Sequence, residues 1–222
     1  MTSAPTEKVT RRERGKADRR ERIVEATYDL LREVGREALS VRMVAERAEV
    51  AVSTLYNLFE SKQAILSAMF DADLEQFKRH MLAEAPDDSL ERIFHTVDVA
   101  TELYRTDPRL QRALLWRPPG SDSDTGLDAA YRGPRIQFWR DLVYDAIRAG
   151  QLKPMPDPRV LAILLVHIFS GAIDDWMANA ISVDRLRDET HFGFAVALHS
   201  FAMAPCAAAL RQKIAHFQRH LA

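Results

Sequence analysis

The fold is decided by residues 39–62, which read LSVRMVAERAEVAVSTLYNLFESK. Ser40 is a good N-cap residue, and an apolar stripe at helical spacing follows it. The stripe consists of Val41, Val44, Ala45 and Ala48. After a break at residues 49–51, apolar residues recur at helical spacing until Ser61 caps the next helix. They are Leu55, Leu58 and Phe59. These spacings predict two short helices separated by three residues.

A longer helix is predicted before this pair. Its apolar residues fall at i, i+3, i+4, i+7, i+8 and i+11, which is one face of an α-helix. They are Ile23, Ala26, Thr27, Leu30, Leu31 and Val34. The helix is expected to begin near Ala17 and to end at Gly35, a suitable C-cap residue. We expect residues 1–15, which hold the charge run at 11–14, to form a disordered basic arm.

The charges of the chain are unevenly distributed. The formal net charge is only −1, but residues 1–22 hold eight Lys or Arg against four Asp or Glu. A basic end on a slightly acidic body is typical of an electrostatic footprint at one pole of the molecule, although solvated tails share this pattern. Two short helices with a longer supporting helix suit the major groove of DNA, where the second helix of the pair meets base edges.

One motif within this stretch is more specific than helix spacing alone. It is Thr54-Leu55-Tyr56-x-x-Phe59-x-x-Lys62, after a helix that contains Val44-Ala45-x-x-Ala48. With Gly35 and the helix before it, the motif resembles the tetracycline-repressor (TetR) family of regulators, over roughly the first 65 residues. The resemblance implies an all-helical homodimer, an operator with two-fold symmetry and a C-terminal ligand pocket.

Two residues depart from the pattern of that family. Glu49 stands where the family usually has Gly at the sharp turn. Glu49 either adopts a left-handed conformation, which costs about 1–2 kcal/mol, or the turn differs slightly. Ala51 stands where the family often has Ser, and the loss of that cap costs about 0.5–2 kcal/mol.

The exposed start and outer face of the second short helix are the candidate base-reading surface. The simpler interpretation is a polar surface face, but the motif favours DNA contact by Val52, Ser53, Thr54, Tyr56 and Asn57. Tyr56 resembles the phosphate-contacting tyrosine of the family. Ser40, Arg42 and Lys62 are further candidates for phosphate contact. Nonspecific phosphate contact is expected from Arg19, Arg20 and Arg22.

The remainder of the chain is also predicted to be helical. No strand pattern stands out, so the fold class is all-α, with about nine to ten helices in total. We expect a helix-turn-helix DNA-binding domain over residues 16–64 and a ligand-binding and dimerisation domain over 65–222. The segment 160–179 is apolar nearly all round until Asp174, which predicts a dimer interface within residues 158–203.

Membrane insertion and secretion are not expected. The longest apolar run, residues 160–173, is shorter than the about 20 residues of a membrane span. No signal peptide is visible, and Cys206, as the only cysteine, excludes an intramolecular disulfide. These features favour a cytoplasmic protein.

Aromatic residues gather in the middle of the chain. They predict either an ordinary bundle core or a pocket for a small molecule. The resemblance raises the second possibility without choosing residues. The candidates for ligand binding are Tyr104, Trp116, Phe138, Trp139, His167 and Trp176.

No residues show catalytic or metal-binding spacing, and we expect no cofactor. The sequence therefore favours a transcriptional regulator, specifically a repressor released from a palindromic operator on double-stranded DNA by a largely apolar small-molecule effector. Two alternatives remain open. One is a regulator that dimerises without sensing a ligand, and the other is an all-helical enzyme with its site in an aromatic cavity.

Overall fold

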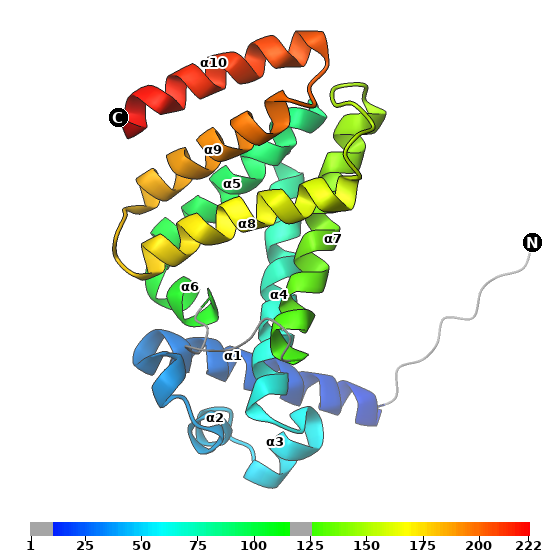
Figure 1. Cartoon of the computed structure of the whole chain (residues 1–222). Coiled ribbons are helices and arrows are strands. Elements are labelled where there is room, and N and C mark those ends of the chain that lie inside the picture. Colours follow the sequence, from blue (N-terminus) through cyan, green and yellow to red (C-terminus); the bar gives the residue numbers. More distant parts are fainter. Residues whose placement is uncertain (1–10, 116–125) are drawn as a thin grey trace, which may run out of the picture.

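The computed structural model describes residues 11–115 and 126–222, and these contain ten helices and no strand. The all-α fold class is therefore confirmed. The helices are α1 (Arg11–Ala38), α2 (Val41–Arg47), α3 (Val52–Phe59), α4 (Lys62–Ala83), α5 (Ser89–Thr106), α6 (Pro108–Leu115), α7 (Gly126–Arg148), α8 (Pro158–Met177), α9 (Val183–His199) and α10 (Ala204–Leu221). Figure 1 shows α1–α3 gathered at one end of the molecule and α10 at the other.

The head consists of α1, α2, α3 and the first turns of α4. Its core is formed by side chains from all four helices, which fixes the crossing of the two short helices. Among the most deeply buried are Ile23, Leu31, Val44, Leu55 and Ile65. The two short helices α2 and α3 are present as predicted, but residues 48–51 separate them rather than 49–51, because Ala48 is the C-cap of α2. Ser40 and Ser61 cap α2 and α4 as expected.

The first helix differs from its prediction at both ends. α1 begins at Arg11, so residues 11–15 are helical instead of belonging to a disordered arm. No proline lies between residues 6 and 85, so no proline stops the helix from extending toward the N-terminus. Gly35 has φ 74°, and the helix kinks there before continuing to Ala38. Residues 1–10 of the expected arm lie outside the described residues.

The body is built from α5 and α7–α10 around one apolar core. α8 packs between α7 and α9, and α10 lies along α9 (Figure 1). The α8–α9 crossing is close, since a Cβ added at Gly193 would lie 2.6 Å from Cγ2 of Ile168. By length and composition alone α8 could span a membrane, but core helices of globular proteins share these properties.

Two helices belong to both parts of the molecule. α4 contributes Met69 to the head core, and α6 contributes Leu110 and Leu114 to it, while both helices also face the body. Nε of Arg32 on α1 lies 2.7 Å from Oδ2 of Asp107, the residue that precedes α6. The head is therefore attached to the body through packed helices rather than through a flexible linker.

Candidate nucleic-acid interface and ligand cavity

The surface of α3 carries the predicted base-reading residues. Leu55 and Phe59 hold the inner face of α3 in the head core, so the residues between them point outward. Tyr56 is 48% exposed, and Asn57 is also exposed. Val52 and Ser53 are exposed as well, whereas Thr54 is half-buried. The structure thus places these five side chains on or at the border of one open surface.

The turn between α2 and α3 resolves the two departures from the family pattern. Glu49 has φ 53°, the left-handed conformation that glycine adopts without strain. The turn is nevertheless closed, because the amide of Val50 donates to the carbonyl of Ala45 at 2.9 Å. Ala51 is the N-cap of α3 and provides no side-chain hydrogen bond. The helix-turn-helix therefore forms without either favoured residue, at some cost in stability.

Charged side chains fix the pair of short helices to α1. Nη1 of Arg20 donates to the carbonyl of Leu58 at 2.5 Å, and its guanidinium lies 4.2 Å from the centroid of the Phe59 ring. Arg20, for which phosphate contact stays a prediction, thus holds the end of α3. Arg47 makes two hydrogen bonds to the Glu33 carboxylate, at 2.9 and 2.7 Å. These contacts orient the exposed surface of α3.

The three further candidates lie near the ends of α1, α2 and α4. Oγ of Ser40 accepts a hydrogen bond from the amide of Met43 at 3.2 Å, and Arg42 is exposed on the next turn. Nζ of Lys62 donates to the carbonyls of Arg36 at 3.2 Å and Leu39 at 2.5 Å. Burial lowers the pKa of Lys62, and the nearby Arg36 lowers it further. Lys62 thus satisfies carbonyls at the end of α1, a structural role that sequence reasoning did not assign.

The role of Lys62 can be tested by its removal. Lys62→Ala should lower the free energy of unfolding by about 1–3 kcal/mol, because two carbonyls lose their charged donor. Lys78→Ala is the matched control on the same helix. It breaks only an exposed pair with Glu75 and should change stability by less than about 1 kcal/mol. Chemical denaturation measures both, and equal stabilities of the two variants would contradict the structural role.

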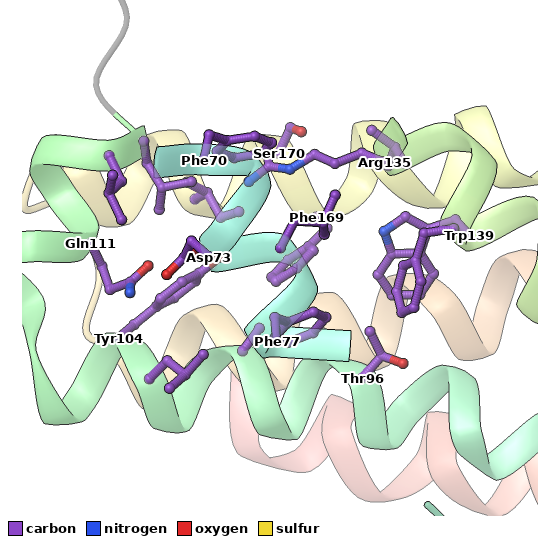
Figure 2. Close-up of a pocket in the computed structure, with 18 residues that line it drawn as sticks. Phe70, Asp73, Phe77, Thr96, Tyr104, Gln111, Arg135, Trp139, Phe169 and Ser170 are labelled. Atoms are coloured by element: carbon purple, nitrogen blue, oxygen red, sulfur yellow. The ribbon is translucent and has the colours of Figure 1, made fainter. Parts of the chain in front are cut away.

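A cavity lies between α4, α5, α6, α7 and α8, and Figure 2 shows its lining. Of the predicted ligand-binding residues, Tyr104, Phe138 and Trp139 line it. The cavity has a volume of about 70 Å³, well below the roughly 300 Å³ or more of most ligand pockets. A ligand of ordinary size would therefore have to move these helices apart.

The other predicted ligand residues do not line this cavity. His167 is exposed, because α8 turns Val166, Phe169 and Ser170 toward the cavity and leaves His167 on its outer side. Trp176 is buried behind the lining, where its ring stacks on Tyr104 at 5.2 Å between centroids. Trp116 lies outside the described residues.

Sequence reasoning missed the polar lining of the cavity. Asp73 on α4, Gln111 on α6 and Arg135 on α7 reach it from three helices, and Figure 2 shows Asp73 beside Gln111 and Tyr104. Burial raises the pKa of the Asp73 carboxyl, while the positive charge of Arg135 partly opposes that shift. Burial also raises the pKa of Tyr104 to about 12, so its hydroxyl stays protonated at neutral pH.

The raised pKa of Asp73 predicts a pH-dependent stability. The ionised carboxylate is disfavoured in the folded state, so stability is lost as pH rises through the folded-state pKa. Asp73→Asn should therefore raise the melting temperature at pH 7.5, and this gain should vanish as pH falls below the ordinary pKa of aspartate. Asp71→Asn, at an exposed position on α4, is the matched control and should give no such pH-dependent gain. Thermal melts across pH measure it, and a lower melting temperature of Asp73→Asn at pH 7.5 would contradict the prediction.

Comparison with known proteins identifies relatives of the head. The family described as "Bacterial regulatory proteins, tetR family" matches residues 23–69. The transcriptional repressor KstR of Rhodococcus jostii is 36% identical over 97 residues, which are 44% of this chain and 46% of KstR. The class A tetracycline repressor from transposon 1721 of Escherichia coli is 39% identical over 66 residues, 30% of this chain and 31% of that protein. The aligned part spans less than half the length of these relatives.

A solved structure shows that the likeness of fold extends through the body. The crystal structure of RolR in complex with the ligand resorcinol has a TM-score of 0.68 at 15% identity. The alignment covers 90% of this chain and 95% of RolR. At this identity the comparison establishes the arrangement of helices, and not what the cavity binds.

Proposed function

We propose that this chain, which belongs to the TetR family of bacterial regulatory proteins, is a cytoplasmic, homodimeric transcriptional repressor. In this proposal it binds a palindromic operator and leaves it when a largely apolar small molecule enters the cavity. Members of the family are DNA-binding regulators and not enzymes, which disfavours the alternative of a helical enzyme.

The observation that carries the DNA-binding part is the exposed surface of α3. A short helix held by a buried inner face, with Tyr56 and Asn57 exposed, suits insertion into the major groove. Asn57 can pair with adenine, and Thr54 or Ser53 can contact a base or a phosphate. Tyr56, Ser40, Arg42 and the remaining donor capacity of Lys62 are assigned to phosphates, which position the head without reading sequence.

The dimer part is supported by the open sides of α8 and α9. Leu164 on α8 and Val196 on α9 are 45% and 46% exposed, and Val160 is exposed as well. A Cβ added at Gly171, which lies on the same side of α8 as Leu164, would meet open space. Exposed apolar side chains on adjacent helices are typical of an interface between subunits. We assign this surface to a second copy of the chain.

The helices shared by head and body support coupling between the cavity and DNA. Along α4, Met69 lies in the head core and Phe70 and Asp73 line the cavity. On α6, Leu114 both packs in the head core and lines the cavity. Because the cavity is small, a ligand that enters it must displace these helices, and the head moves with them. The separation of two recognition helices would then depart from the about 34–36 Å between successive major grooves.

Two observations support a small-molecule effector: the aromatic lining of the cavity, and the likeness in fold to RolR, which was solved with resorcinol. The competing possibility is a regulator that dimerises and senses nothing. Ligand and operator must affect each other reciprocally if the coupling is real. A compound that binds the cavity should therefore bind less tightly when operator DNA is present, by the same factor by which it weakens operator binding. Equal affinity with and without operator would exclude that compound as the effector.

The DNA-binding part is tested by selection from random duplexes with the purified full-length protein. The expected result is an enriched palindrome whose half-sites lie about one helical turn apart, bound in a gel shift at physiological salt. Recovery of no preferred sequence, or of a single half-site, would contradict a dimeric sequence-specific repressor.

A further inference from the structure

The cavity has walls that suit a flat apolar molecule. Six aromatic side chains line it: Phe70, Phe77, Tyr104, Phe138, Trp139 and Phe169. Several of these rings pack against each other edge to face, such as Phe77 on Phe138 at 5.9 Å between centroids. Burying a planar apolar body among such rings is favourable, and the edges of the rings limit its thickness.

One end of the cavity is polar and has unused hydrogen-bonding capacity. Tyr104 and Gln111 are each only 6% exposed, and Asp73 lies between them in Figure 2. Within residues 11–115 and 126–222, none of these three side chains makes a hydrogen bond to another residue. Buried amide and hydroxyl groups nearly always have partners, so these groups indicate a place for a polar ligand atom.

The charges around this end favour an uncharged ligand. Asp73 and Arg135 are both close enough to Tyr104 to shift its pKa in opposite directions, after the larger effect of burial. Each of these two charges attracts one kind of ion and repels the other, so neither an ammonium nor a carboxylate gains a clear net attraction. Either ion would also lose its hydration on entering this mostly apolar cavity. A neutral group that both donates and accepts is compatible with the two charges and with Gln111.

We propose that the effector is an uncharged, flat apolar molecule with a hydroxyl group at one end, and that this hydroxyl donates to Asp73 and accepts from Gln111 or Tyr104. This inference rests on the proposed function, since it names the ligand class of the proposed effector site. The hydrogen bond to the carboxylate is the strongest contact, because one partner is charged. Asp73 is therefore the residue that distinguishes a hydroxylated ligand from its hydrocarbon.

The test uses four probes that share one ring: benzene, phenol, benzoate and benzylammonium. Each is titrated into the full-length protein without DNA and followed by ligand-detected NMR. Phenol should bind at least about tenfold more tightly than benzene, and more tightly than either ion. A phenol affinity equal to that of benzene, a preference for either ion, or no binding by any probe would each overturn the proposal.

Variants assign the preference to its residue. Asp73→Ala should lower the affinity for phenol to that for benzene while benzene still binds. Asp71→Ala, two residues away on the exposed side of α4, should keep the preference. If Asp73→Ala does not fold, the order of the four probe affinities on the unmodified protein still supports or overturns the proposed ligand class. The probe titrations contain no DNA, so their result does not depend on operator binding. A ligand that binds the cavity but does not release operator would count against the proposed function and not against the proposed ligand class.

Discussion

Aspartate in place of Leu164 or Val196 is expected to convert the protein to a monomer and to weaken operator binding by about 100-fold or more. Both side chains are apolar and nearly half exposed in the single chain. Burial of an unpaired carboxylate between two copies would cost several kcal/mol, which is enough to separate them. A single head can then occupy only one half-site at a time.

Sedimentation velocity measures the first effect and a gel shift measures the second. Leu82→Asp is the matched control, because Leu82 is also an exposed leucine but lies on α4, outside α8 and α9. It should leave both assembly and binding unchanged. A dimer that survives Leu164→Asp and Val196→Asp, or an unmodified protein that sediments near 25 kDa, would contradict the assignment of this interface.

Alanine at Asn57 or Thr54 is expected to weaken binding to the selected operator by about 5- to 150-fold, or roughly 1–3 kcal/mol, with little change on random DNA. The reason is that a lost base contact affects only the sequence that supplied it. Tyr56→Phe should act differently and weaken binding to all duplexes by a similar factor, because phosphates are common to every sequence.

Parallel titrations on operator and on a scrambled duplex at one salt concentration distinguish the two outcomes. Far-ultraviolet circular dichroism checks that the variants keep their helices. Equal losses on both duplexes for Asn57→Ala would show that Asn57 positions the backbone and does not read a base.

The helices of this chain could be predicted because their ends carry local signals. Ser40 and Ser61 begin helices through their own side chains, and Pro108 stands at the first position of α6. Such signals act within a few residues and need no knowledge of the fold. The start of α1 was missed because charged residues form helices as readily as arms, and no stop signal separates the two.

The exposed surface of α3 could also be predicted, because the motif specifies the burial of Leu55 and Phe59 and the rest follows from helix geometry. The polar lining of the cavity could not be predicted from the sequence. Asp73 and Gln111 look like ordinary polar residues on amphipathic helices, and only the packing of α4, α6 and α7 around the cavity places them in its lining. The contacts of Lys62 with the carbonyls of Arg36 and Leu39 could not be predicted either, because they depend on the kink at Gly35.

The last helix has a consequence for how many copies can assemble. α10 covers one side of α9, where Leu210 and Phe217 are buried and the Phe217 ring meets His191 at 4.9 Å between centroids. A surface that pairs with its own copy about a two-fold axis is fully buried once two copies meet. A second exposed apolar surface on each copy would allow further copies to add. For a chain that pairs through α8 and α9, α10 removes that second surface. In the proposed dimer, α10 would therefore limit the assembly to two subunits.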